Sequence, residues 1–104
     1  MCGFIGYISN DNKDDFEIDT LLKDASNSIQ SRGPDEESYL KVSNVYFAFR
    51  RLAIQDISSN AHQPMISDDG NFAIIFNGEI YNFREIRKKL QIEEKVNFKS
   101  KSDT

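Results

Sequence analysis

The sequence contains a single cysteine among its 104 residues, so no disulfide can form within the chain. A lone thiol agrees with a reducing compartment. No apolar run is long enough for a membrane span, and the short apolar stretch at the N-terminus lacks the basic flank of a signal peptide. We therefore expect a cytoplasmic protein that contacts no membrane.

Positive charge is also scarce. The 13 lysines and arginines are outnumbered by 17 acidic residues, and the net charge is −4. This balance does not favour a nucleic-acid partner and is typical of a solvated acidic surface. The sequence also has no metal-ligand spacing and no glycine-rich phosphate loop, so we expect no metal site and no cofactor in this segment.

Apolar periodicity predicts the elements of the first half of the chain. Residues 2–8 form a short apolar run typical of a buried strand. Residues 17–29 predict an amphipathic helix, which Gly33 and Pro34 end. The apolar stripe of this helix has spacings of three and four, and it comprises Ile18, Leu21, Leu22, Ala25 and Ile29. Residues 38–42 and 45–50 predict paired strands around a two-residue turn.

The second half predicts three further elements. Residues 72–76 are continuously apolar, which suits a strand buried on both faces. Asn82 can cap a helix over residues 83–90, and residues 96–99 favour another strand. Two helices cannot cover about five strands, so we expect an incomplete part of a larger α+β domain. A compact two-layer α+β domain is the alternative.

Cys2 is a candidate nucleophile. Removal of Met1 would make it the N-terminal residue, and its α-amine and thiol have reference pKa values of about 7.7–8.0 and about 8.5. The amine could therefore take the thiol proton near neutral pH. The alternative is a buried structural thiol, the commoner state of a lone cysteine.

Asn77 and Gly78 directly follow the apolar run at residues 72–76. A side-chain amide and a backbone N–H at a strand end can converge on a developing oxyanion. The alternative is a type I′ turn joining two strands. The helical spacing that follows does not favour a tight hairpin.

Arg50 and Arg51 point to opposite faces of a strand, so one should reach solvent and the other should face inward. An inward arginine needs an anion, either a substrate α-carboxylate or an internal carboxylate. Glu79 and Asp103 are candidate acceptors for a substrate ammonium, or else ordinary surface carboxylates.

Taken together, these segments resemble the class II glutamine amidotransferases, and within them the asparagine synthetase type. The motifs occur in the family's order and spacing across all 104 residues. They are Met1-Cys2-Gly3, Arg32-Gly33-Pro34-Asp35, the six residues 51–56, Gln63-Pro64-Met65, the six residues 77–82, and Ser102-Asp103-Thr104.

The resemblance implies an N-terminal nucleophile hydrolase fold, an αββα sandwich of two stacked antiparallel sheets between helix layers, incomplete in this chain. By position, Cys2 attacks the side-chain amide of L-glutamine, and Asn77 and Gly78 form the oxyanion hole. The remaining roles concern glutamine binding. Arg51 binds the α-carboxylate, Glu79 and Asp103 hold the α-ammonium, and Leu52, Ala53, Ile54 and Gln55 line the substrate through backbone groups.

The resemblance further implies that ammonia passes to a C-terminal synthetase domain in cis, which uses ATP and Mg²⁺ to make L-asparagine from aspartate. We expect this piece by itself to be inactive, and a homodimer stays open. Two alternatives also stay open. One is an amidotransferase of another branch or acceptor, such as an amino sugar or a surface polysaccharide. The other is a non-catalytic binding module with the same fold.

Overall fold

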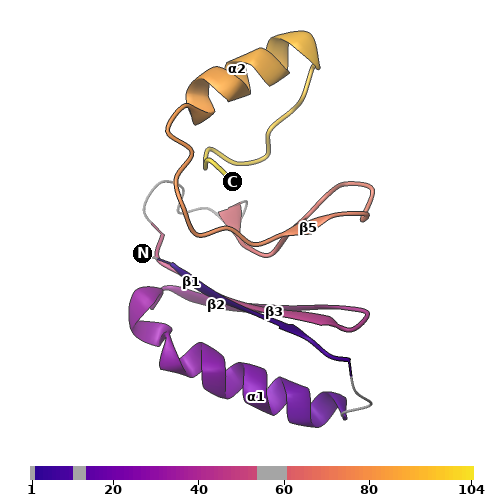
Figure 1. Cartoon of the computed structure of the whole chain (residues 1–104). Coiled ribbons are helices and arrows are strands. Elements are labelled where there is room, and N and C mark those ends of the chain that lie inside the picture. The colour runs from indigo at the N-terminus through magenta and orange to yellow at the C-terminus, as the bar shows by residue number, and fades with distance from the viewer. Residues whose placement is uncertain (1, 11–13, 54–60) are drawn as a thin grey trace.

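The computed structural model describes residues 2–10, 14–53 and 61–104. These residues form an α+β fold with two small antiparallel sheets and two α-helices (Figure 1). Within these three ranges, no helix combines the length and apolar character needed to cross a membrane.

The larger sheet has three strands in the spatial order β1–β3–β2. The strands span Gly3–Ile8 (β1), Glu36–Val42 (β2) and Val45–Arg51 (β3). The predicted hairpin is confirmed, because Ser43 and Asn44 connect β2 to β3 in antiparallel register. Since β1 pairs with the other edge of β3, β3 is the central strand, and its end carries the arginine pair.

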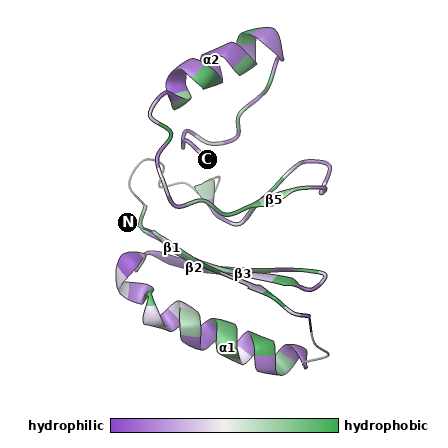
Figure 2. Cartoon of the chain, viewed as in Figure 1, coloured by the Kyte–Doolittle hydropathy of each residue, from purple (hydrophilic) through white to green (hydrophobic). Residues whose placement is uncertain are grey.

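Helix α1, over Asp15–Ser28, packs on β3 and β1 and is followed by a 3₁₀ turn over Gln30–Arg32. The Asp14 side chain accepts a hydrogen bond from the N–H of Phe16 and caps the helix N-terminus. Figure 2 shows the alternation of hydrophobic and hydrophilic residues along α1 that lets one side face the sheet. The buried core between helix and sheet consists of Ile18, Leu22, Tyr46 and Ala48, flanked by the partly buried Ile5 and Tyr7.

The predicted helix is confirmed, but its apolar stripe was partly wrong. Leu21 is 54% exposed, whereas Ser26 is fully buried. The buried positions step by four, from Ile18 to Leu22 to Ser26, so Leu21 lies on the flank of the contact. A polar residue therefore occupies a core position of this helix.

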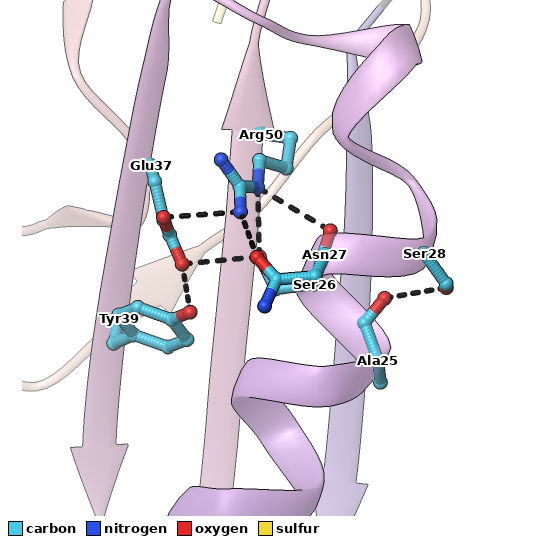
Figure 3. Close-up of polar contacts among 7 residues, drawn as sticks. All are labelled: Ala25, Ser26, Asn27, Ser28, Glu37, Tyr39 and Arg50. Atoms are coloured by element: carbon cyan, nitrogen blue, oxygen red, sulfur yellow. Dashed lines mark hydrogen bonds and ion pairs between the residues drawn. The ribbon is translucent and has the colours of Figure 1, made fainter.

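Ser26 is buried because Arg50 of β3 needs hydrogen-bond acceptors there. The Arg50 guanidinium donates to Ser26 Oγ at 2.9 Å and to Asn27 Oδ1 at 2.8 Å (Figure 3). It also pairs with Glu37 Oε2 at 3.0 Å, and Glu37 accepts the hydroxyl of Tyr39. Burial, and then the hydrogen bond to Glu37, raise the pKa of Tyr39, so the phenol stays a neutral donor. This cluster ties the last turn of α1 to the end of β3.

The expectation that one of the two arginines reaches solvent was wrong. Arg50 and Arg51 are each only 5% exposed. They do point to opposite faces, but each lies directly across from a glutamate of β2, Glu37 and Glu36 respectively. Cross-strand pairs of opposite charge neutralise both cations, so neither side chain needs water.

In the part of the chain that the structure describes, the second sheet consists of β4, over Met65–Ile66, and β5, over Ala73–Ile74. The prediction of a strand over residues 72–76 buried on both faces was therefore wrong in length and in burial. Phe72 is 74% exposed and Ile74 is 51% exposed. Such an apolar run needs covering layers on both sides, and the described residues do not provide them.

Helix α2 spans Phe83–Glu93, longer than the predicted helix by one turn. Asn82 occupies the N-cap position, but its side chain makes no capping hydrogen bond. The predicted strand over residues 96–99 was wrong. Among the described residues this segment forms no strand, and Arg87 of α2 holds it by placing its guanidinium over the Phe98 ring at 4.4 Å and by donating to the carbonyl of Ser100.

In Figure 1 the layers follow one another as α1, the three-stranded sheet, the β4–β5 hairpin and α2. This helix–sheet–sheet–helix order is compatible with part of the expected αββα sandwich, although the second sheet is short. The sheet face away from α1 exposes large apolar side chains, with Phe4 at 46% and Ile8 at 63%. That face is where the two sheets approach.

Candidate active site

A cavity of about 520 Å³ lies between the N-terminal end of β1, the end of β3 and the segment after β5. It brings together residues from five parts of the sequence. Every predicted site residue that the structure describes lines it, namely Cys2, Arg51, Leu52, Ala53, Asn77, Gly78, Glu79 and Asp103. Ile54 and Gln55, also predicted to bind substrate, lie outside the described residues.

Cys2 immediately precedes β1 and is half-buried in the cavity wall. The N–H of Leu52 points at its sulfur, with 3.3 Å between Leu52 N and Cys2 Sγ. The carbonyl oxygen of Cys2 accepts two side-chain hydrogen bonds, from Asn77 Nδ2 at 2.9 Å and from Arg32 Nε at 3.3 Å. Side chains from two segments thus fix the cysteine backbone, a third segment contacts the sulfur at Leu52, and Cys2 lines the cavity.

Arg51 lies on the cavity side of β3, the face opposite Arg50. Its Nη1 is 2.9 Å from Glu36 Oε2, and the other oxygen of Glu36 is 2.6 Å from Nε2 of His62. The internal salt bridge considered for this arginine is therefore present. Arg51 also lines the cavity, and the ion pair holds its guanidinium in place.

The Arg32–Asp35 segment wraps around the end of β3. The N–H of Asp35 donates to the carbonyl of Arg51 at 3.0 Å, and its carboxylate accepts the N–H of Ala53 at 2.8 Å. Gly33 lies directly on the peptide between Arg50 and Arg51. These contacts hold the chain on either side of Leu52, so the segment shapes the cavity wall.

We expect that replacing Gly33 with alanine destabilises the protein and distorts the cavity. A Cβ atom there would lie 2.3 Å from the carbonyl carbon of Arg50 and 2.5 Å from the nitrogen of Arg51. Both obstacles are backbone atoms, so the strand end or the Arg32–Asp35 segment must move. The cost is about 1–3 kcal/mol in the free energy of unfolding, the usual range for overpacking.

Denaturant titration measures this loss of unfolding free energy, with Gly70→Ala as the comparison. Gly70 has φ +72° but nothing within 4 Å of an added Cβ, so Gly70→Ala reports backbone strain without a clash. Equal stability of Gly33→Ala and the wild type would contradict the close approach.

Asn77 and Gly78 do not form the type I′ turn considered as an alternative. That turn needs positive φ at both residues, and neither of them has it. The chain instead leaves β5, passes the cavity at these two residues and continues toward α2. Asn77 thereby reaches the Cys2 carbonyl, which places a side-chain amide next to the cysteine.

Glu79 and Asp103 complete the acidic side of the cavity. Oδ2 of Asp103 accepts the N–H of Ile80 at 2.8 Å, which ties the last residues of the sequence to the Asn77–Glu79 segment. The site thus combines a thiol, a buried guanidinium and two carboxylates around one space. That arrangement suits an amino acid, with its carboxylate and ammonium held at separate points.

Three side chains that the sequence did not single out as site residues hold these groups. Glu36 pairs with Arg51, Asp35 holds the backbone of Ala53, and Gln63 contacts the segments that precede Asn77 and follow Asp103. Asp35 and Gln63 lie within motifs that carry the family resemblance, whereas Glu36 lies in none, and all three make their contacts across strands or loops distant in sequence. Within the described ranges, no group of three or more histidine, cysteine or acidic side chains is placed to hold a metal ion.

Comparison with known families gives the class of protein to which the chain belongs. A family model described as "Glutamine amidotransferase domain" matches residues 1–104. The chain belongs to this family.

Several similar curated proteins are glutamine-hydrolyzing asparagine synthetases. Asparagine synthetase 1 of Bacillus subtilis (strain 168) is 39% identical over 105 residues, covering 100% of this chain and 16% of that protein. Asparagine synthetase 2 of the same organism is 42% identical over 94 residues, covering 86% and 12%. A probable asparagine synthetase of Acanthamoeba polyphaga mimivirus is 34% identical over 98 residues. The chain therefore spans less than a fifth of the length of these relatives.

Proposed function

We propose that this chain is the N-terminal part of a glutaminase domain that hydrolyses L-glutamine to glutamate and ammonia. The observation that carries the proposal is the convergence of Cys2, Arg51, Asn77, Gly78 and Asp103 on one cavity. These residues come from both ends and the middle of the sequence. A surface loop or a structural thiol would not require such a gathering.

In this proposal Cys2 becomes the N-terminal residue once Met1 is removed. Its free α-amine takes the proton of the thiol, and the sulfur attacks the side-chain amide carbon of glutamine. The carbonyl oxygen becomes an oxyanion that Asn77 Nδ2 and the N–H of Gly78 stabilise. The amine returns the proton to the departing nitrogen, ammonia leaves and a thioester forms. Water then attacks the thioester, releasing glutamate and regenerating the thiol.

Binding of glutamine divides between the two sides of the cavity. Arg51 meets the α-carboxylate, and Glu36 behind it holds the guanidinium in place. Glu79 and Asp103 accept the α-ammonium on the acidic side. Backbone groups from Leu52 to Gln55 line the substrate. The ion pair with Glu36 supports this assignment because a buried arginine that is already oriented loses little freedom when it binds a carboxylate.

We further propose that the ammonia is used by an ATP-dependent synthetase domain of the same protein to convert aspartate to L-asparagine. The similarity to glutamine-hydrolyzing asparagine synthetases supports this acceptor. ATP and Mg²⁺ would serve that domain, and no residue of this chain is assigned to them. Dimerisation and a cytoplasmic location are further expectations for the whole protein.

The test uses the full-length protein and measures glutamate released from glutamine. We expect turnover by the wild type, and we expect Arg51→Lys to raise the KM for glutamine about 10- to 100-fold with kcat nearly unchanged. Lysine keeps the charge but loses the bidentate fork, so it weakens uniform binding of the carboxylate. Arg84→Lys, at an exposed position of α2, is the matched control. A wild type without glutaminase activity would refute the function, and an unchanged KM would refute the role of Arg51.

A further inference from the structure

Gln63 is a buried polar residue in the wall of the cavity, with only 8% of its surface exposed. Its Oε1 accepts the backbone N–H of Phe76 at 2.5 Å, and its Nε2 donates to Thr104 Oγ1 at 3.3 Å. A backbone N–H can only donate, so the atom facing Phe76 must be the amide oxygen. This fixes the orientation of the amide and directs its nitrogen to Thr104.

The backbone of Gln63 is anchored as well. Its carbonyl oxygen accepts the hydroxyl of Ser38, in the middle of β2. β2 pairs with β3, which ends at Arg51. One residue therefore connects the sheet that carries the arginine to two segments that approach the cavity from other parts of the chain.

The two segments held by the amide are those that deliver the opposite sides of the site. Phe76 immediately precedes Asn77, and Thr104 immediately follows Asp103. Asp103 is also tied to the end of the Asn77–Glu79 segment, through the N–H of Ile80. The Gln63 amide thus connects these segments at a second point. Two connections fix the distance between the segments, whereas one connection would let them rotate about it.

We infer that Gln63 is a positioning residue that sets the distance between the Asn77–Gly78 pair and Asp103 around the bound substrate. The inference rests on the proposed function of the same site. Gln63 exchanges no proton with glutamine. It acts by holding the backbone next to the groups that do contact the substrate. A displacement of about 1 Å in such a group costs on the order of 10²-fold in rate.

The two hydrogen bonds of the amide predict separable effects. Gln63→Met keeps the length of the side chain but removes both bonds, so we expect kcat for glutamine hydrolysis to fall about 10- to 100-fold. Thr104→Val removes only the acceptor for Nε2. We expect it to raise the KM for glutamine about 5-fold with kcat nearly unchanged, because it loosens the Asp103 side alone. Gln91→Met, on an exposed position of α2, should leave both constants unchanged.

A role in positioning, as opposed to general stability, is tested by two further measurements on the full-length protein. Glutamate γ-semialdehyde forms a tetrahedral adduct with a thiol and needs an oxyanion hole, whereas alkylation of Cys2 by iodoacetamide does not. We expect Gln63→Met to weaken aldehyde binding by the factor lost in kcat, while the rate of alkylation stays at the wild-type value.

The outcomes are distinct. Equal aldehyde binding in the wild type and Gln63→Met, or an unchanged kcat, overturns the inference while the proposed function stands. If Gln63→Met does not fold, Thr104→Val decides, and an unchanged KM in that variant overturns the inference. A wild type that releases no glutamate refutes the proposed function instead.

Discussion

Replacing Cys2 with alanine should abolish glutamine-dependent activity of the full-length protein and leave ammonia-dependent asparagine synthesis intact. The sequence contains no other cysteine, and Cys2 is the one residue whose sulfur lines the cavity. Removal of a covalent nucleophile costs on the order of 10⁴-fold or more in kcat. Glutamate release measures the first activity, and asparagine formation from ammonium chloride measures the second.

The control for this experiment is the state of the N-terminus. Intact mass reports whether Met1 is gone, and only in the processed protein does Cys2 itself carry the free α-amine that activates the thiol. Cys2→Ser is a closer mimic of the wild type, because its hydroxyl can still accept the N–H of Leu52 and donate to the Leu52 carbonyl but is a much weaker nucleophile. Undiminished glutaminase activity in Cys2→Ala would refute the thioester mechanism.

Replacing Asn77 with alanine should lower kcat for glutamine hydrolysis about 10²- to 10³-fold, the usual effect of removing one oxyanion donor. This corresponds to about 3 kcal/mol of transition-state stabilisation. The KM should change little, because the oxyanion exists only in the transition state and the intermediates. Steady-state kinetics of glutamate release provide both constants.

Asn82→Ala is the control for Asn77→Ala. Asn82 is an exposed asparagine five residues further on, and its side chain makes no capping hydrogen bond to α2. Asn77→Ala also removes a hydrogen bond to the Cys2 carbonyl. The rate of Cys2 alkylation by iodoacetamide separates the two effects, because a displaced cysteine changes that rate and a lost oxyanion donor does not. An unchanged kcat in Asn77→Ala would show that the oxyanion is stabilised elsewhere.

The two halves of the fold differ in how well local sequence pattern predicts them. Helix α1 and the β2–β3 hairpin could be predicted because apolar spacing and a two-residue turn act within about a dozen residues. The apolar run at residues 72–76 predicts a buried strand, yet only Ala73 and Ile74 pair, and they are exposed. Burial of such a strand depends on layers supplied from elsewhere, which local composition cannot report.

The candidate site shows the same division. Motif order and spacing were enough to name Cys2, Arg51, Asn77, Gly78 and Asp103, and the structure places all five around one cavity. Their supporting residues could not be named in the same way. Glu36 and Glu37 pair with adjacent arginines through the register of β2 against β3, and a shift of one residue would exchange their faces.

The sequence alone determined the chemistry available to this protein: a single thiol near the N-terminus, an Asn–Gly pair after an apolar run, and an arginine pair at a strand end. The tertiary structure decided which partners orient those groups. Both arginines are buried because two cross-strand glutamates neutralise them. Gln63 joins segments that lie 13 and 41 residues away in the sequence. These contacts depend on strand register and on the packing of segments distant in sequence. The spacing of neighbouring residues predicts neither.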